Sequence, residues 1–199
     1  MKHTTALAKL ALLMTVASLT HVGHAQSVST ASQQLELSAF GAATGTFTNI
    51  EGGKNLGITA GLDLTYLPLR LLRPSIEVRG TYPIYDGHVD SQKNILAGVR
   101  VEHAFGRLHP YADFLIGRGE IDFGQGGFVV GDIEYISTNT TIYSPGVGVD
   151  YSLGHGLAVK ADLQYQHWDT PVVSSGTIHP AALSLGAVYH FNFNPRNHR

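Results

Sequence analysis

The sequence has no cysteine, few charged side chains (14%), and no apolar run of membrane-helix length outside its first 25 residues. Without cysteine, disulfides and thiolate chemistry are excluded, so packing and hydrogen bonds alone hold the fold. A membrane helix needs about 18 or more consecutive apolar residues, which excludes helical spans after the N-terminus. The formal charge is −2 and no basic stripe is present, so nucleic acid is not an expected partner.

The first 25 residues have the order of a secretory signal peptide. Lys2 supplies a basic start, an apolar stretch runs from Leu10 to Leu19, and Gly23-His24-Ala25 offers small residues for cleavage after Ala25. The alternative is an N-terminal anchor, but the apolar stretch is short for one. Residues 26–34 are rich in Ser, Gln and Thr and are expected to be a flexible lead-in.

The last strong pattern in the chain predicts a long amphipathic strand at residues 181–193. Its odd positions are all apolar and end in three aromatic residues, whereas its even positions are mostly small or polar. Successive side chains on a strand point to opposite faces, so this strand has one apolar and one polar face. Its length suits a tilted strand that crosses a bilayer, which takes about 9–11 residues.

The same alternation recurs along the chain and predicts eight strands joined at hairpin distances. The expected strands are at about 35–44, 56–66, 75–84, 94–105, 112–117, 143–151, 157–166 and 181–193. No connection has room for a crossover helix, so the sheet is antiparallel. The longest connection is 124–139. Pro145 is unusual in a paired strand, so the sequence leaves open the register of the strand at 143–151. The barrel domain would span 35–193, with a tail at 194–199.

The two faces predict which way the barrel is turned. A soluble barrel would enclose the apolar set as a ligand cavity, but eight strands leave little interior volume for so many large side chains. The fold class is therefore an all-β, eight-stranded, antiparallel up-and-down transmembrane barrel with a filled polar lumen. The expected lumen charge network is Glu36, Asp63, Glu77, Arg79, Arg100, Glu102, Asp113, Asp150, Lys160 and Asp162.

Aromatic residues at strand ends are the expected girdle at the lipid headgroups: Tyr66, Phe105, Tyr151, Tyr189, Phe191 and Phe193. With the eight strands, the turn before Pro110-Tyr111 and the final Val188-Tyr189-His190-Phe191, the chain resembles the small outer-membrane β-barrel family of OmpA- and OmpX-type proteins. The resemblance implies a place in the outer membrane of a Gram-negative bacterium, contact with its lipid, and insertion by the barrel-insertion machinery. Family members usually end on an aromatic residue, whereas here residues 194–199 follow Phe193.

The charged lumen residues are expected to pair, Glu77 and Arg79 with Arg100 and Glu102, and Lys160 with Asp162, because unpaired buried charges cost several kcal/mol each. Such a network leaves at most a very narrow pore. The histidines are scattered without a metal-binding motif or a close pair, so neither a metal nor a cofactor is expected.

Two functions from different classes stay open. A non-catalytic structural or adhesion-like role would use the apolar, β-prone loop that contains Phe128, Val129, Ile133 and Tyr135, which could bind an extracellular partner along a strand edge. The alternative is an enzyme that modifies lipid A or phospholipid, as some barrels of the resembled family do. Its only candidate residues are His167 and Asp169 with Ser174 or Ser175.

Overall fold

The structure is a computed structural model that describes residues 34–48, 53–69, 71–85, 90–123, 127–130 and 132–191. The expected signal peptide, nearly all of the lead-in, the tail and Phe193 lie outside these residues. Eight long strands are present: β1 Leu35–Phe47, β2 Lys54–Tyr66, β3 Leu72–Tyr85, β4 Asp90–His103, β5 Leu108–Phe123, β8 Ser137–Gly154, β9 Leu157–Tyr165 and β12 Ala181–Phe191. Four short ones are β6 Phe128–Val130, β7 Ile133–Tyr135, β10 His167–Asp169 and β11 Thr177–Ile178.

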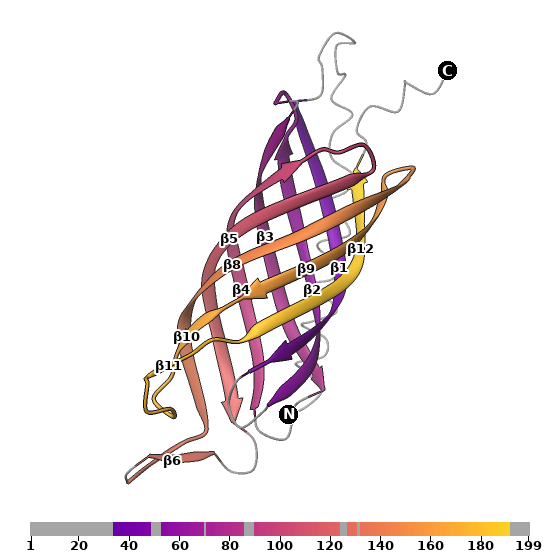
Figure 1. Ribbon diagram of the computed structural model, residues 1–199. Helices are drawn as coiled ribbons and strands as arrows, with labels where there is room; N and C mark the ends of the chain where they lie inside the picture. The colour runs from indigo at the N-terminus through magenta and orange to yellow at the C-terminus, as the bar shows by residue number, and fades with distance from the viewer. Residues whose placement is uncertain are drawn as a thin grey trace, which may run out of the picture. The chain divides into compact units, whose positions relative to one another are not determined.

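The long strands form one closed antiparallel barrel (Figure 1). Each of β1 to β5 pairs with its neighbour in sequence, β5 pairs with β8, β8 with β9, and β9 with β12. The last strand returns to the first, with Leu37 opposite Phe191 and Phe47 opposite Ala181. The prediction of an eight-stranded antiparallel barrel is confirmed. Among the described residues, no helix is long and apolar enough to cross a membrane.

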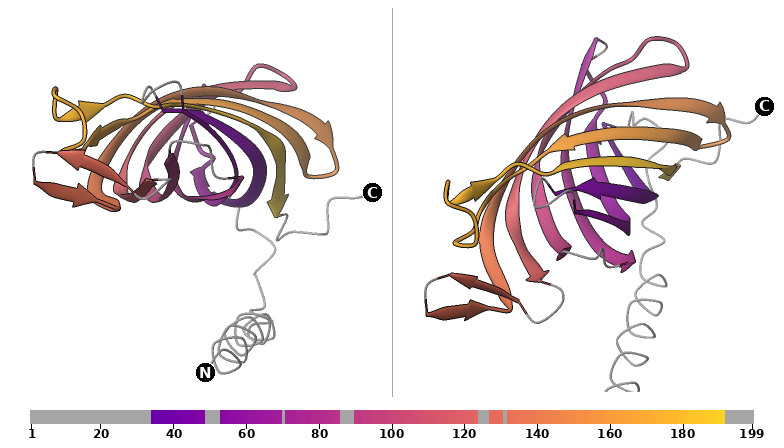
Figure 2. Two further views of the ribbon diagram at one scale, coloured as in Figure 1. Left: turned by 90° about the horizontal axis from the view of Figure 1, so that it is seen from below. Right: turned by 60° about the horizontal axis from the view of Figure 1, so that its bottom comes forward.

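The two ends of the barrel differ in the size of their connections. The β2–β3, β4–β5 and β8–β9 connections lie at one end, called here the short-turn end. The β8–β9 turn is tight enough to hold Gly154, His155 and Gly156 at positive φ. At the other end, called the long-loop end, β6 and β7 form a separate two-stranded hairpin beyond β5 and β8, near the β10–β11 turn (Figures 1 and 2).

Several strands are longer than the alternation predicted. β4 begins at Asp90, in the expected loop, and β5 runs from Leu108 to Phe123 instead of 112–117. Pro110 is tolerated because β5 pairs with β4 only from Tyr111 onward. β8 begins at Ser137, well before the expected start at 143.

The register is regular at Pro145, where the sequence left it open. Pro145 lies opposite Phe114 of β5. On its other side, the pairing with β9 begins at Gly146 and the pairing with β10 ends at Tyr143. The missing N–H of proline therefore falls in the break between β9 and β10, where no ladder bond is lost.

The outward face of the barrel is apolar and exposed, and the inward face is polar and buried. Ile76, Val99 and Leu185 each expose about 60% of their surface (60%, 60% and 59%). The lumen holds most of the buried charged side chains, together with a cluster of buried apolar ones. This distribution is the reverse of a water-soluble barrel, as the sequence predicted.

We predict that Gly98→Ala destabilises the barrel, whereas Gly41→Ala does not. A Cβ on Gly98 would lie 2.1 Å from the carbonyl oxygen of Phe114, so β4 and β5 would have to separate. A Cβ on Gly41 meets nothing within 4 Å. Overpacking of this kind costs about 1–3 kcal/mol. The measurement is the fraction of refolded protein that changes gel mobility on boiling, and equal fractions for the two variants would contradict the prediction.

Candidate functional site

The lumen charges gather around two arginines rather than in separate pairs. Arg79 of β3 makes ion pairs with Glu77 on its own strand, with Asp162 of β9 at 2.7 Å, and with Asp113 of β5 at 3.5 Å. All three carboxylates are buried, and the Arg79 side chain is 3% exposed. Since these residues come from three strands, Arg79 links opposite walls of the barrel.

Arg100 of β4 is the second centre. Its Nη2 lies 2.6 Å from Asp150 and 3.1 Å from Glu102, and its Nη1 lies 3.3 Å from Asp63. The separation of 3.9 Å between Arg100 and Glu77 connects the two centres. Pairing between β3 and β4, which the sequence suggested, is thus a minor part of the network.

Lys160 behaves differently from the sequence prediction that it pairs with Asp162. Its Nζ has no hydrogen-bond partner among the described residues and lies 4.4 Å from the ring centres of both Phe40 and Tyr111. A cation over an aromatic face is stabilised by the ring quadrupole, most strongly where water is excluded. Asp162 instead accepts a hydrogen bond of 2.8 Å from the Tyr111 hydroxyl.

Glu36 lies apart from the other predicted network residues. It faces the short-turn end and is only partly buried, and its carboxylate lies 3.0 Å from Nδ1 of His190. The remaining set, called here the lumen network, has six carboxylates and three cations: Asp63, Glu77, Glu102, Asp113, Asp150 and Asp162 with Arg79, Arg100 and Lys160. The excess of carboxylates makes this part of the lumen unfavourable for a free anion.

An apolar cluster fills another part of the barrel. It consists of Leu96, Leu115, Ile121, Phe123, Ile142, Trp168 and Ile178, and is called here the apolar cap. Trp168 is fully buried and donates a hydrogen bond of 2.9 Å to Gln166. A Cβ on Gly119 would lie 2.4 Å from both the Trp168 ring and Ile142, so glycine is needed for this packing. Tyr135, Val172 and Val173 pack against the cap from the long-loop end.

Outward aromatic residues lie at both ends of the strands. Tyr66, Phe105, Tyr151 and Tyr189 are exposed at the short-turn end, where Phe191 is partly exposed and packs edge-on against Tyr189. Phe105 lies just beyond β4, in a bridge with Leu108. The sequence analysis missed the corresponding residues at the other end, where Phe47, Tyr82, Tyr143 and Tyr165 are exposed.

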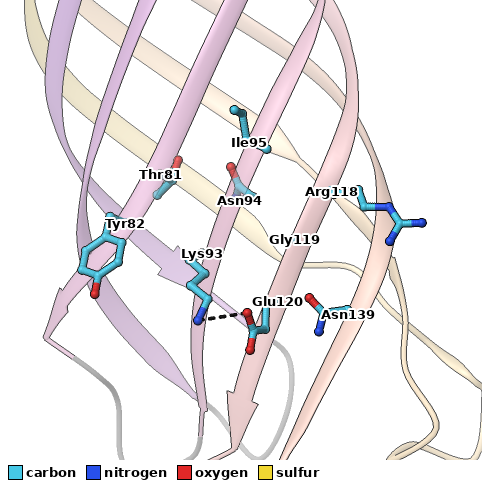
Figure 3. Close-up of a pocket in the computed structure, with 9 residues that line it drawn as sticks. All are labelled: Thr81, Tyr82, Lys93, Asn94, Ile95, Arg118, Gly119, Glu120 and Asn139. Carbon is cyan, nitrogen blue, oxygen red and sulfur yellow. Dashed lines mark ion pairs between the residues drawn. The ribbon is translucent and has the colours of Figure 1, made fainter. Parts of the chain in front are cut away.

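Outward charges also occur at the long-loop end. Lys93 of β4 lies 3.0 Å from Glu120 and 3.1 Å from Asp122 of β5. Figure 3 shows Lys93 and Glu120 beside a shallow depression on the outer face, which Arg118 also lines. These charges mark the limit of the apolar band at the long-loop end, since charged side chains on the lipid-facing surface are costly at mid-membrane and tolerated near its edges.

The candidate catalytic residues do not form a relay. Nε2 of His167 lies 3.5 Å from Asp169, but its Nδ1 lies 3.0 Å from Nε2 of His179, where a relay would need a serine hydroxyl. Ser175 donates its hydroxyl hydrogen bond to the Thr177 carbonyl instead. The expectation that no two histidines are close is wrong here, because β10 and β11 lie side by side.

The predicted surface loop contains a short hairpin. Phe128 of β6 pairs with Tyr135 of β7, and Val129 pairs with Glu134. Ile133 is exposed (57%), and Tyr135 is partly buried against the apolar cap. Among the described residues, no group of three or more His, Asp or Glu side chains is arranged to hold a metal ion.

A closed barrel with an apolar outer face, aromatic ends and a charged interior defines an integral outer-membrane β-barrel protein of bacteria. Residues 7–191 match the model of the outer membrane protein beta-barrel domain, and the chain belongs to this family. No curated protein sequence matches the chain significantly.

Two solved structures of low sequence identity share the fold. Neisserial surface protein A is 14% identical with a TM-score of 0.51, and the match covers 80% of this chain and 98% of that one. Ail, the attachment invasion locus protein of Yersinia pestis, is 13% identical with a TM-score of 0.50, covering 79% and 97%. The outer membrane enzyme PagL is 17% identical with a TM-score of 0.45, covering 77% and 98%.

Sequence reasoning missed the uncharged partners of the lumen network. Gln164 donates to Asp113 at 3.0 Å, and Ser144 donates to Gln164 at 2.7 Å. Phe40 and Tyr111 flank Lys160. All four residues lie at inward positions of their strands, which the alternation of polar and apolar side chains could have shown. The sequence did not show which strands they would contact across the lumen.

We predict that Arg79→Met destabilises the folded barrel by about 3–5 kcal/mol, because Glu77, Asp113 and Asp162 would lose the cation they share. The matched control is Arg73→Met. Arg73 is 29% exposed and lies 3.7 Å from Glu102, so its loss should have little effect. Urea unfolding in lipid vesicles, followed by fluorescence of the single tryptophan, Trp168, measures both variants. Equal loss of stability in the two would contradict the central place of Arg79.

Proposed function

We propose that this protein acts without catalysis as a surface-interaction protein of the outer membrane, and that its β6–β7 hairpin binds an extracellular protein. The observation that carries the proposal is the hairpin itself. It forms a sheet separate from the barrel, so each of its strands has one edge unpaired by the described residues. In this family of folds the longer loops face the cell exterior.

The hairpin offers both backbone and side-chain recognition. An unpaired strand edge can add an extended segment of another protein through main-chain hydrogen bonds. Ile133 and Ile136 are 57% and 67% exposed and offer apolar contacts, and Glu134 is an exposed acid between them in sequence. The packing of Tyr135 against the apolar cap ties this surface to the barrel, which lowers the entropy lost on binding.

The contents of the lumen support a role outside the barrel rather than through it. Arg79 bridges opposite walls, Arg100 joins β4 to β2 and β8 on either side of it, and buried apolar side chains fill the space around Trp168. We therefore propose that the barrel conducts ions poorly or not at all. The name of Ail, an attachment protein of the same fold, is compatible with a surface role but does not supply a partner for this chain.

The lipid-modifying enzyme is the alternative function, and its candidate residue is His167. The contact of His167 with His179 rather than with a serine speaks against a serine–histidine relay in this arrangement. A change in lipid A mass spectra on expression of the wild type, absent with His167→Ala, would favour the enzyme over the surface role.

We predict that deleting residues 126–136 abolishes binding of expressing bacteria to cells or matrix while the barrel still folds. Asp122 and Ser137 are paired, so residues 123–125 would remain as a three-residue hairpin loop, a length that hairpins commonly use. Replacing Ile133 and Ile136 with Ser should weaken binding without removing the hairpin. The matched control is Leu153→Ser, which removes an equally exposed residue at the short-turn end. Unchanged binding by the folded deletion variant would refute the proposal.

A further inference from the structure

The strongest unexplained feature lies outside the lumen, where two histidines face each other at the long-loop end. β10 and β11 pair with Trp168 opposite Ile178 and Asp169 opposite Thr177. This register places His167 opposite His179. The two rings lie on the outward side, because side chains alternate along a strand and the adjacent Trp168 and Ile178 point into the apolar cap. Nδ1 of His167 and Nε2 of His179 are 3.0 Å apart.

We propose that His167 and His179 form a binding site for a divalent transition-metal ion, Cu²⁺ in preference to Zn²⁺, with water completing the coordination. Imidazole nitrogens are common ligands for both ions, and Cu²⁺ binds the more tightly to a given set of nitrogen ligands. The proposed site has only two protein ligands. Among the described residues, no group of three or more His, Asp or Glu side chains could hold a metal ion.

The two nitrogens are close enough to share one ion. Metal–nitrogen bonds are about 2.0–2.1 Å long, so two nitrogens on one ion are about 3.3 Å apart at a tetrahedral angle. At the right angle of a square-planar Cu²⁺ site, the same bonds place them about 2.9 Å apart. The observed 3.0 Å is the length of the present hydrogen bond and lies within about 0.3 Å of both values, so small ring movements reach either geometry. In the present hydrogen bond one nitrogen carries the proton and the other the lone pair. To bind an ion, the donor ring would move this proton to its other nitrogen or release it, and a small rotation of the rings would then direct both lone pairs at the ion.

Neighbouring side chains hold the two rings in place. The His179 ring stacks on Tyr165, with centroids 5.7 Å apart and planes at 16°. The His167 ring lies 6.4 Å from that of Tyr143. Trp168, between His167 and Asp169 in β10, anchors the strand in the apolar cap. Ligands held in this way lose less conformational entropy when an ion binds.

Asp169 provides a further element of a metal site. Its carboxylate lies 3.5 Å from Nε2 of His167, the nitrogen that is turned away from His179. A hydrogen bond from Nε2–H to a carboxylate would leave the lone pair on Nδ1 for the ion. Metal-binding histidines commonly have such a partner, which fixes the tautomer and orients the ring. We assign Asp169 this positioning role.

The experiment titrates Cu²⁺ into the full mature chain, folded in detergent, and records the electron paramagnetic resonance spectrum. Nitrogen hyperfine structure counts the ligands without any substitution, and two coupled nitrogens are expected. His167→Gln and His179→Gln should each weaken binding by at least about tenfold, since each leaves one imidazole. Asp169→Asn should weaken it less, with both nitrogens still coupled.

The matched control is His155→Asn, which removes an exposed imidazole from the β8–β9 turn at the opposite end and should bind as the wild type does. Each variant is first checked for the folded band on an unboiled gel. Absence of saturable Cu²⁺ binding, a spectrum with fewer than two coupled nitrogens, or equal binding by the wild type and both glutamine variants would overturn the proposal.

Discussion

The constraint on which this structure depends is that lipid offers no hydrogen bonds to a strand edge. Every backbone N–H and C=O within the bilayer must pair inside the protein, which allows a sheet only if it closes on itself. Here β12 pairs with β1 along its whole length, so within the described part of the chain no long strand keeps a free edge in the apolar band. With closure fixed, the outer face must be apolar and the interior must take the polar side chains.

An eight-stranded interior is narrow, and the chain fills it with two kinds of packing. Around Arg79 and Arg100, buried carboxylates from several strands converge, so the network joins strands that make no ladder contact with each other. Around Trp168, apolar side chains pack as in an ordinary protein core. The apolar cap also supports both proposed sites at the long-loop end. Tyr135 of the β6–β7 hairpin packs against it, and Trp168, between His167 and Asp169, is part of it.

The alternation of side chains was enough to predict the eight strands and their antiparallel order in a barrel, because a half-apolar strand has a period of two. Strand ends were harder: β5 and β8 extend beyond the band, where no apolar face is required, so their polar ends resembled loops. Contacts between side chains across the lumen could not be predicted from the sequence. Lys160 and Asp162 are neighbours on one face, yet Lys160 lies between two rings, and only the closed register shows why. The contact between His167 and His179 likewise depends on a short hairpin that no alternation marks.

The central claim, an outer face in lipid and an inner face away from it, is tested most directly by single-cysteine scanning along β2, since the natural chain has no cysteine to remove. Each residue from Leu56 to Leu64, except Gly57 and Gly61 where a Cβ would overlap neighbouring atoms, would be replaced in turn, labelled with an environment-sensitive fluorophore, and exposed to a quencher attached to lipid chains. The account predicts strong quenching at positions 56, 58, 60, 62 and 64 and weak quenching at the replaced positions between them. The opposite alternation, or quenching without any period of two, would contradict it.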